Sequence, residues 1–417
     1  MRRPGDSIFP LEYTVQQETS AGGLVSKQLL FIPGPVTVAE PVLLAAARPL
    51  IDHRGPEFGE LLARVSARLK PLFGTERADV LLLGSSGTGG LEAAVANLFG
   101  PGDRVLACPM GVFGQRLLSI ARTLGCDVDV LETEWGDALD PQRLAAKLHE
   151  PGAPRYRGIL LTHNETSTGT QSDMAALAEV LRRTDALTVV DSVSGLGAVE
   201  FRMDDWRYDV VVTASQKALA APPGLAMIAI GTRAWTRMGA APAGTRFYFD
   251  LRKAREMATS GQTPWTPPVS LVFALDAALA EFEAAGAAAS WTRHERYARA
   301  IRACAQALGL ELYSRPEAHS VTVVAIRLPH GIDAGTIRTM LRESRNVVIG
   351  GGQGTLAGKI IRIGTMGDLS QTDVLGALGA LEIALLEVGA PIRAGAGVQA
   401  ALRVFLESEQ TAALAPS

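Results

Sequence analysis

Residues Val189–Gly224 read VVDSVSGLGAVEFRMDDWRYDVVVTASQKALAAPPG, and this stretch holds the pattern that decides the fold. One apolar run ends in Asp191, and a second apolar run ends in Ser215, Gln216 and Lys217. Short, continuous runs rich in valine predict strands that are buried on both faces. A carboxylate and a lysine therefore stand at the ends of two predicted strands.

The same alternation of strand, turn and helix surrounds this stretch from about residue 70 onward. Strands are predicted at 79–84, 104–108, 158–163, 187–191 and 208–215, and helices at 89–99, 140–150 and 172–183. Apolar strands that alternate with helices predict an α/β domain whose mostly parallel sheet is covered by helices on both faces. Such sheets bind ligands beyond the carboxyl ends of their strands, which is where Asp191 and Lys217 are expected.

Lys217 differs in its surroundings from the other five lysines of the chain. Those five lie in the N-terminal segment, on charged helices or beside a glycine turn: Lys27, Lys70, Lys147, Lys253 and Lys359. Lys217 follows an apolar strand and is flanked by small residues. A lysine that loses its hydration has a lowered pKa, so its amine becomes a usable nucleophile. The alternative is a lysine at a strand end whose side chain reaches solvent.

The pairing of Asp191 with Lys217 points to pyridoxal phosphate chemistry. In enzymes that use this cofactor, a lysine holds the aldehyde as a Schiff base. A carboxylate keeps the pyridine nitrogen protonated, so that the ring acts as an electron sink. Alone, Asp191 fits the commoner role of a turn or cap residue. Two such groups at neighbouring strand ends favour the catalytic role.

A site for the cofactor's phosphate is predicted in LLGSSGTGGLEAAVANLF, residues 82–99, which reads as strand, turn and helix. The backbone N–H groups of Gly87 and Thr88 lie at the helix N-terminus, where the helix dipole favours an anion. The hydroxyls of Ser86 and Thr88 can add donors. The turn matches neither the dinucleotide pattern GxGxxG nor the pattern GxxxxGK[ST], which disfavours a nicotinamide-dependent dehydrogenase.

Two further segments are expected at the same edge of the sheet. PMGVFGQR places Phe113 between glycines, where an aromatic ring can stack on a planar cofactor; the alternative is a place in a minor apolar cluster. THNETSTGT, residues 162–170, is dense in hydroxyl and amide groups, and Thr166 is predicted to hydrogen-bond the ring hydroxyl. For His163 and Glu165 we expect ordinary structural roles.

Composition limits the class of protein. With 417 residues, 47% of them hydrophobic and 20% charged, the chain predicts a globular protein of two domains. A net charge of −3 gives no reason to expect nucleic acid or an anionic membrane as partner. The cysteines Cys108, Cys126 and Cys304 have no metal-binding spacing and predict reduced thiols in the cytoplasm. No membrane span and no secretory signal is expected.

The pattern changes after about residue 285. A long helix is followed by short strands with glycine turns, and two helices close the chain, which predicts a smaller α+β domain. We therefore predict an N-terminal arm at 1–29, a large cofactor-binding domain at 30–285 and a small C-terminal domain at 286–417.

Taken together, these residues resemble the class V aminotransferases of fold type I, and within them the alanine/serine–glyoxylate aminotransferase group. The likeness runs from about Leu30 to the C-terminal helices. The motifs that carry it, in chain order, are FIPGPVTV, GSSGTGGLEAA, GVFGQR, HNETSTG, VVDSVSGLG, SQKALAAPPG, TPWTPPVS and IRIGTMG. Each motif alone has little specificity, but eight in one order are specific.

The resemblance implies a role for each matching residue around the cofactor. Lys217 would be the cofactor-bound lysine and Asp191 the partner of the pyridine nitrogen. Val193 would pack under the ring, on the face opposite Phe113. The phosphate would be bound by Ser86, Gly87, Thr88 and Gln216.

The resemblance also implies how substrate and subunits are arranged. Arg362 would hold the substrate α-carboxylate, which suits a planar guanidinium fork. Gly34 and Pro35 would line the substrate pocket. Thr263 and Thr266 would reach the phosphate of the neighbouring subunit, so the family is a homodimer with shared active sites.

The activity that the resemblance implies is transfer of an amino group from a small amino acid, serine or alanine, to a small 2-oxo acid, glyoxylate or pyruvate. Two features depart from parts of the family. Thr88 stands where some relatives carry histidine, so the local contacts at the phosphate differ. IDHRGPEF, residues 51–58, resembles the serine–glyoxylate branch, and His53 and Arg54 are expected at a substrate side chain, at the partner subunit or in a plain surface loop.

Several alternatives stay open at this point. Relatives with the same motifs use ureidoglycine with glyoxylate, or pyridoxamine with pyruvate. The cysteine desulfurases need a mobile catalytic cysteine, whereas Cys304 lies inside a predicted helix. A non-catalytic binding protein of this fold would be expected to lose Lys217, Asp191 or Arg362, and all three are present.

Overall fold

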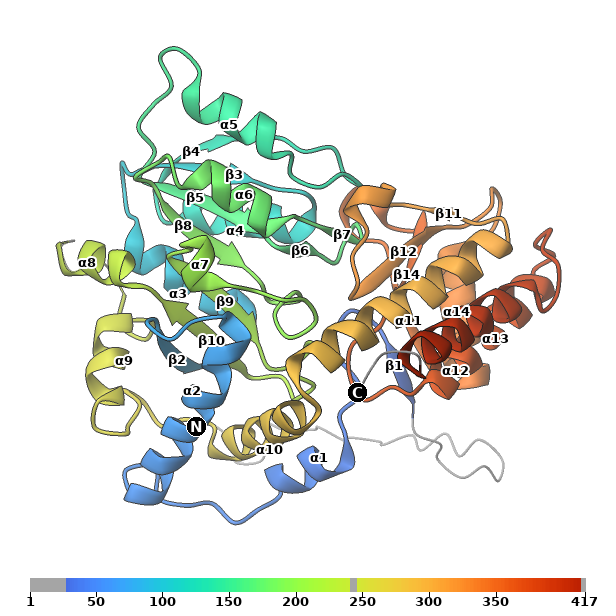
Figure 1. Ribbon diagram of the computed structural model, residues 1–417, viewed down its shortest axis with the longest axis horizontal. Coiled ribbons are helices and arrows are strands. Elements are labelled where there is room, and N and C mark those ends of the chain that lie inside the picture. Colours follow the sequence, from blue (N-terminus) through green and yellow to red (C-terminus); the bar gives the residue numbers. More distant parts are fainter. Residues whose placement is uncertain (1–27, 241–245, 414–417) are drawn as a thin grey trace, which may run out of the picture.

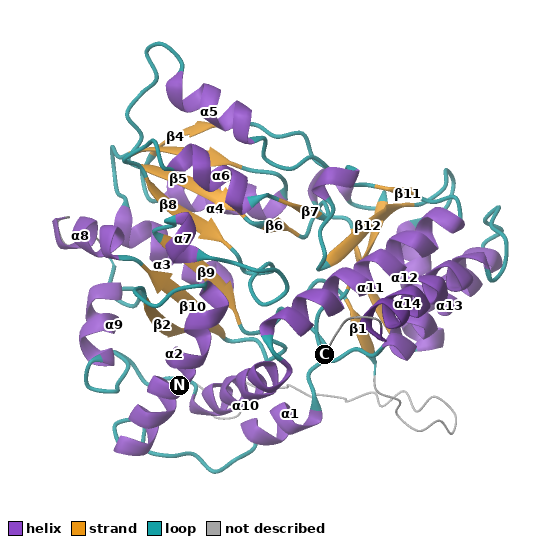
Figure 2. Ribbon diagram, in the orientation of Figure 1, coloured by secondary structure: helices purple, strands orange, loops and turns teal. Residues whose placement is uncertain are grey.

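Two β-sheets form the frame of the molecule, and each is covered by its own helices (Figures 1 and 2). The computed structural model describes residues 28–240 and 246–413. Figure 1 shows the two units side by side, one coloured blue to yellow and the other mostly orange to red, with the blue strand β1 Leu29–Phe31 added to it. The predicted N-terminal arm, residues 1–29, lies almost entirely outside the described residues.

The larger sheet has seven strands in the order β2-β10-β9-β8-β5-β3-β4. All of them run parallel except β10, which is antiparallel to both of its neighbours. Their bounds are β2 Asp79–Gly84, β3 Arg104–Cys108, β4 Asp127–Val130, β5 Gly158–Thr162, β8 Leu187–Asp191, β9 Val210–Ala214 and β10 Leu225–Ile230. The prediction of a mostly parallel sheet is confirmed.

Helices cover both faces of this sheet, which explains why its central strands are apolar throughout. On one face, a core cluster joins the sheet to α2 Pro56–Phe73, α5 Pro141–His149, α6 Met174–Leu181, α7 Met203–Trp206 and α10 Val269–Ala285, with α1 Glu40–Ala46 beside α10. On the other face, a second cluster joins it to α3 Gly87–Leu98, α4 Val112–Thr123, α8 Thr232–Ala240 and α9 Leu251–Ala258. Every residue of β5, β8 and β9 is buried.

Local sequence sets where the helices begin. The helix predicted at 89–99 begins two residues earlier, at Gly87, because the Ser86 hydroxyl accepts a hydrogen bond from the backbone N–H of Gly89 and caps it. The carboxylate of Asp140 caps α5 in the same way, by accepting from the N–H of Gln142. Both caps lie directly before the helix that they start.

The smaller sheet has five strands in the order β1-β13-β14-β12-β11 and is backed by four helices. Its strands are β1 Leu29–Phe31, β11 Glu311–Leu312, β12 Val323–Arg327, β13 Val347–Gly351 and β14 Ile360–Gly364. Its helices are α11 Ala287–Ala307, α12 Ala334–Arg345, α13 Gln371–Glu387 and α14 Ala396–Ala413. Short elements complete the chain: β6 Asn164–Glu165, β7 Thr170–Gln171, and the 3₁₀ turns Pro316–Ala318 and Gly354–Leu356.

The start of the predicted large domain needs a correction. We placed the boundary at residue 30, but β1 pairs in parallel with β13 and so belongs to the smaller sheet. A three-residue apolar strand carries no mark of its partner, so the sequence pattern could not assign it. The chain enters the larger unit only after β1.

Within 28–240 and 246–413, no helix combines the length and the apolar character that crossing a membrane requires.

Candidate active site

A cavity opens beyond the carboxyl ends of β2, β5, β8 and β9, and most of the predicted cofactor residues line it. Nine of them meet there: Ser86, Gly87, Thr88, Phe113, Thr166, Asp191, Val193, Gln216 and Lys217. Four residues that the sequence did not single out also line it: Leu91, Arg116, Asn164 and Ser194. The parallel strands bring these separate segments to one edge because their carboxyl ends share it.

Lys217 is partly buried at this edge. Its Nζ donates a hydrogen bond of 2.6 Å to the carbonyl oxygen of Pro33. Burial lowers the pKa of Lys217 to about 8, although the carboxylate of Asp191 acts in the opposite direction. A substantial fraction of the amine is therefore neutral near physiological pH, as a nucleophile requires.

The segment before α1 approaches Lys217 closely. A Cβ atom on Gly34, whose φ is +130°, would lie 2.8 Å from Nζ of Lys217, so only glycine fits there. Pro35 is exposed, and neither Gly34 nor Pro35 is among the residues that line the cavity. Their place in the substrate pocket stays a prediction.

Asp191 is the last residue of β8 and is 4% exposed. Its Oδ1 accepts a hydrogen bond of 3.0 Å from the backbone N–H of Val193. Burial raises the pKa of Asp191 to about 7, and the charge of Glu165 acts in the same direction, whereas Lys217 lowers it. Such a carboxylate gains from a cationic ligand, and a protonated pyridine nitrogen is one.

The N-terminus of α3 is built to receive an anion. Gly87 is required there, because a Cβ atom would lie 2.8 Å from Cγ2 of Val193. The amide oxygen Oε1 of Gln216 is buried and has no hydrogen-bond partner among the described residues. Free backbone N–H groups and two hydroxyls suit a phosphate, so the cavity fits pyridoxal phosphate; the Gln216 amide oxygen can only accept and needs a donor other than the phosphate.

The polar loop that follows β5 holds the backbone of Phe113 in place. Both the N–H of Phe113 and the N–H of Gly114 donate to Oε2 of Glu165, at 3.0 and 2.9 Å. The N–H of Val112 donates to Oγ of Ser167. These bonds satisfy the first free N–H groups of α4. Glu165 is 0% exposed and does not line the cavity, so its role is to fix Phe113.

His163 also lies outside the cavity. Its Nδ1 is 2.9 Å from Oγ of Ser192, and its ring packs on Phe201. Burial lowers the pKa of His163 to about 4, which keeps the imidazole neutral. This is the structural role that we expected for it.

Arg362 connects the smaller sheet to the cavity. Its Nη1 donates 2.7 Å to the carbonyl oxygen of Thr166, and its Nε donates 2.7 Å to the carbonyl oxygen of Gly351. The side chain is buried, and burial lowers its pKa to about 10, so it remains a cation at neutral pH. The guanidinium thus lies beside a cavity residue from the larger unit.

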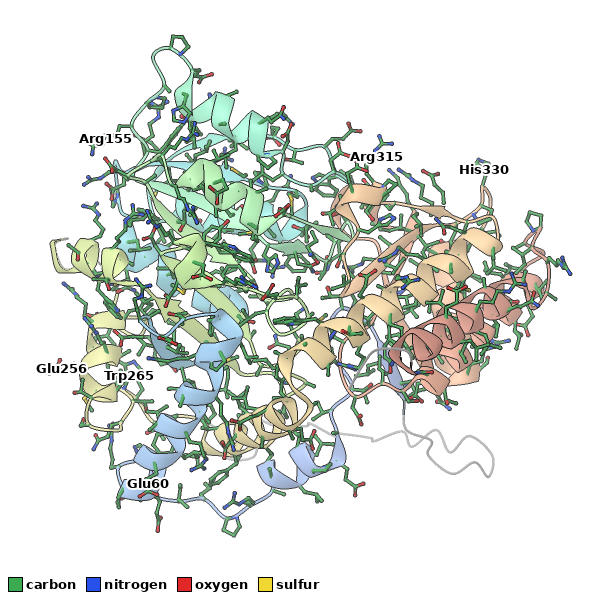
Figure 3. The ribbon with its side chains drawn as sticks, in the orientation of Figure 1. Glu60, Arg155, Glu256, Trp265, Arg315 and His330 are labelled. Carbon is green, nitrogen blue, oxygen red and sulfur yellow. The ribbon has the colours of Figure 1, made fainter. Side chains whose placement is uncertain are left out.

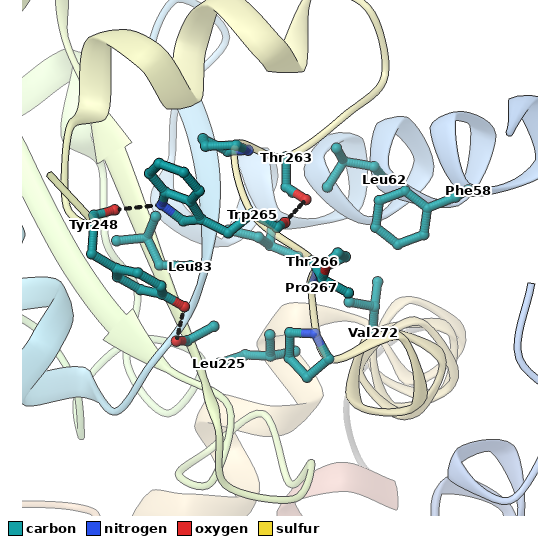
Figure 4. Close-up of a pocket in the computed structure, with 14 residues that line it drawn as sticks. Phe58, Leu62, Leu83, Leu225, Tyr248, Thr263, Trp265, Thr266, Pro267 and Val272 are labelled. Atoms are coloured by element: carbon teal, nitrogen blue, oxygen red, sulfur yellow. Dashed lines mark hydrogen bonds between the residues drawn. The ribbon is translucent and has the colours of Figure 1, made fainter. Parts of the chain in front are cut away.

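Thr263 and Thr266 do not reach this cavity within the chain. They line a second cavity with Tyr248, Trp265 and Phe58, which Figure 4 shows. Oγ1 of Thr263 donates to the carbonyl oxygen of Trp265, and Nε1 of Trp265 donates to the carbonyl oxygen of Tyr248. Trp265 lies at the periphery near α9, away from the smaller unit (Figure 3).

The cavity residues that sequence reasoning missed differ in whether the sequence carries a signal for them. Arg116 follows Phe113 by three residues on α4, a spacing that puts both on one helix face, so it could have been found. Asn164 lies in the polar stretch 162–170, but no sequence pattern indicates that its Nδ2 donates to Ser194 and Thr322. Ser194 lies in the turn after β8, and no sequence pattern indicates its place in the cavity either.

The cysteine expected inside a helix is there. Cys304 lies within α11 and is fully buried, and burial raises the pKa of its thiol to about 12. A thiol of this kind is unreactive and immobile. Within the described residues, no group of three or more His, Cys, Asp or Glu side chains could hold a metal ion.

Comparison with known proteins gives a consistent result. The family model described as aminotransferase class-V matches residues 44–374. The "Soluble hydrogenase 42 kDa subunit" of Anabaena cylindrica is 39% identical over 91% of this chain and 99% of that protein. The L-aspartate–glyoxylate aminotransferase of Paracoccus denitrificans is 38% identical over 93% and 99%. The serine–glyoxylate aminotransferase of Methylorubrum extorquens is 34% identical over 91% and 96%.

Solved structures agree with these sequences. The ureidoglycine–glyoxylate aminotransferase of Bacillus subtilis has a TM-score of 0.86 at 31% identity and covers 92% of this chain and all of its own. The pyridoxamine–pyruvate aminotransferase of Mesorhizobium loti has a TM-score of 0.87 at 30% identity, over 92% and 98%.

Proposed function

Because the chain belongs to the class-V aminotransferases, a family that depends on pyridoxal phosphate, we propose that it transfers an amino group from a small amino acid to glyoxylate. Serine and alanine are the proposed donors, and pyruvate is the second proposed acceptor. The observation that carries the proposal is that Lys217 lines the cavity while Arg362, a buried cation outside the lining, donates to the carbonyl oxygen of Thr166, which lines it. The names of three relatives, which pair glyoxylate with aspartate, serine or ureidoglycine, support the acceptor.

Each residue of the cavity has a part in this chemistry. The cofactor, when bound, supplies an aldehyde that takes up the amino group and a ring that accepts electrons. Lys217 provides the attachment and then, as a free amine, moves the proton from the substrate's Cα. Asp191 would hold a positive charge on the pyridine nitrogen, and Phe113 and Val193 would hold the ring between them. Arg362 orients the carboxylate that donors and acceptors share.

Aspartate is a second candidate donor. The relative from Paracoccus denitrificans, named for aspartate and glyoxylate, is more similar to the chain than the serine relative. A second guanidinium, that of Arg338 on α12, also lies near Arg362. A Cβ atom on Gly351 would lie 2.9 Å from Nη1 of Arg338, and Arg362 bonds the carbonyl oxygen of this same glycine. A dicarboxylate donor would use such a second basic group for its side-chain carboxylate.

The proposed donor is tested by spectroscopy and product analysis. The purified protein, loaded with pyridoxal phosphate, is titrated with L-serine, L-alanine, L-aspartate and, as same-fold alternatives, ureidoglycine and pyridoxamine. The true donor shifts the visible absorption of the cofactor and, with glyoxylate added, yields glycine. A loaded enzyme that forms no glycine with any donor would refute glyoxylate as acceptor. The Lys217→Ala variant is the control and should form no product.

We further propose that the protein is a homodimer in which Thr263 and Thr266 complete the phosphate site of the partner. Their absence from the lining of the Lys217 cavity within one chain supports this, as does the exposed aromatic surface beside them. Phe247 is 75% exposed and stacks on Trp265, over which Lys253 also lies. The hydrogen bonds of Arg54 to Gln262 and to the carbonyl oxygen of Thr263 join the predicted loop of His53 to this surface.

Shared sites can be tested by complementation. Mixed dimers of Lys217→Ala and Thr266→Ala subunits contain one site with both residues intact, so we expect them to recover part of the activity that each parent lacks. Confirmed mixed dimers without recovery would show that each chain holds a complete site.

All three cysteines are unpaired and buried, which supports the cytoplasm as the proposed location.

A further inference from the structure

Arg116 is a charged residue of the Lys217 cavity to which the sequence gave no role. It lies on the second turn of α4, is exposed, and lines the cavity. Together with Asp191 and Lys217 it makes up the charged groups that line this cavity. The other residues assigned to the phosphate, from Ser86 to Gln216, are all neutral.

Two contacts fix the guanidinium of Arg116. Its Cζ lies 4.8 Å from the ring centroid of Phe113, one helical turn earlier on the same face. Its Nη1 donates a hydrogen bond of 3.1 Å to Oγ1 of Thr88, at the N-terminus of α3. The guanidinium therefore spans the gap between the ring-stacking residue and the anion site.

The bond to Thr88 also decides which way that hydroxyl points. Arginine can only donate, so Oγ1 of Thr88 must accept from Arg116. A hydroxyl has a single hydrogen, and the hydrogen of Thr88 is then left to donate to a third group. A phosphate at the N-terminus of α3 would be that group.

We propose that Arg116 binds the phosphate of pyridoxal phosphate, both directly through its guanidinium and by orienting the Thr88 hydroxyl toward the same oxygen atoms. The inference deepens the proposed function and rests on it. A phosphate carries close to two negative charges, and a helix N-terminus offers only about half a positive charge, so a neutral cradle leaves the anion undercompensated. Arg116 supplies the missing cation with a fork that suits phosphate.

The test separates the phosphate from the ring by comparing two ligands. Protein freed of cofactor is titrated with pyridoxal phosphate and with pyridoxal, which lacks the phosphate, and binding is followed by visible absorption. For Arg116→Gln we expect the Kd for pyridoxal phosphate to rise about tenfold, the effect of losing a charge-assisted hydrogen bond. The Kd for pyridoxal should stay within about twofold of that of the parent, since none of the phosphate contacts is made.

Two further variants complete the design. Arg122→Gln removes the same charge from the exposed end of the same helix and should change neither Kd, because Arg122 does not line the cavity. Thr88→Val removes the hydroxyl but keeps the shape, and it should also weaken pyridoxal phosphate selectively. Since Arg116 is exposed, its loss should leave the melting temperature of the cofactor-free protein unchanged.

Three other outcomes of the titrations would each have a distinct meaning. If Arg116→Gln weakens both ligands equally, Arg116 acts on the ring through Phe113, and the proposal is overturned. If neither Kd changes, Arg116 has no part in cofactor binding. If the parent protein binds neither ligand, the proposed function itself fails, and that result is distinct from the other two.

Discussion

Asp191 and Asp209 are two buried aspartates in the same sheet, and they differ in what satisfies them. Asp209 stands before the amino end of β9 and is 3% exposed. Its carboxylate accepts from both the N–H and the hydroxyl of Thr188 and lies 3.6 Å from Nη1 of Arg233. Asp191, at the carboxyl end of β8, accepts within the described residues one hydrogen bond, from Val193, and faces the cavity.

The difference separates a structural charge from a chemical one. Burial raises the pKa of both carboxylates, so a raised pKa alone does not mark an active site. At Asp209 the protein supplies the partners that burial demands. At Asp191 the hydrogen bonds are left incomplete, and this gap is what a ligand can fill. Unsatisfied acceptors at a strand end are therefore more informative than charge or burial alone.

The sharpest way to break this comparison is to neutralise each aspartate in turn. We expect Asp191→Asn to lower kcat about 10³-fold, as loss of a preorganised charge does, while the fold is kept. Asp209→Asn should leave the activity per folded molecule unchanged, because Asp209 does not line the cavity, and should change only the free energy of unfolding. Kinetics and urea unfolding measure the two effects. Equal losses of activity would contradict the assignment.

The second prediction concerns stability against pH in the cofactor-free protein. Because the pKa of Asp191 is raised to about 7, the folded protein keeps a proton that the unfolded chain releases above about pH 4. Stability due to Asp191 is thus full at low pH and falls as pH rises from about 4 to 7, by about 4 kcal/mol. Asp191→Asn should lose this fall, so its advantage over the parent should grow across that range. Parallel curves would contradict a raised pKa.

A third prediction extends the comparison to the cations. Arg362→Gln should raise KM for 2-oxo acids about 100-fold with a smaller change in kcat, because a charge-assisted fork is lost. Arg327→Gln is the matched control, since Arg327 lies on neighbouring β12 and pairs with Glu311 at the surface. It should leave both constants unchanged. An unaltered KM in Arg362→Gln would remove this arginine from the substrate site.

The smallest expected effect is on the rate of cofactor uptake. With the pKa of Lys217 lowered to about 8, the neutral amine increases with pH up to that value. Uptake of pyridoxal phosphate should therefore rise about tenfold per pH unit below pH 8 and level off above it. Stopped-flow absorption with excess cofactor measures this. A rate that keeps rising to pH 10 would indicate an ordinary, solvated lysine.

The sequence was sufficient for those features that depend on strand ends. Asp191 and Lys217 were predictable because apolar runs show where strands stop, and parallel strands stop at one edge. Ser86 and Gly87 were predictable because a turn between a strand and a helix leaves free backbone N–H groups at the helix N-terminus. The mostly parallel character of the larger sheet followed from the alternation of strand and helix.

Other features could not be predicted because they depend on side-chain direction or long-range pairing. The bond from Arg362 to Thr166 joins residues of different units, and no local pattern encodes it. The buried carboxylate of Glu165 fixes the start of α4 from a separate loop, whereas the sequence around it indicates an ordinary polar turn. β1 could not be assigned to its sheet for the same reason.

The position of β1 has a consequence for any attempt to divide the protein. A gene fragment that starts at residue 286 would encode α11 to α14 but leave β13 without its parallel neighbour, and an open strand edge invites aggregation. The larger unit, produced alone, would carry β1 without the strand β13 that it pairs with. The segment that carries Pro33, whose carbonyl oxygen receives the hydrogen bond of Lys217, is anchored through β1 to the other sheet. The position of the Lys217 amine is thus tied to a strand whose partner a cut between the two units would remove.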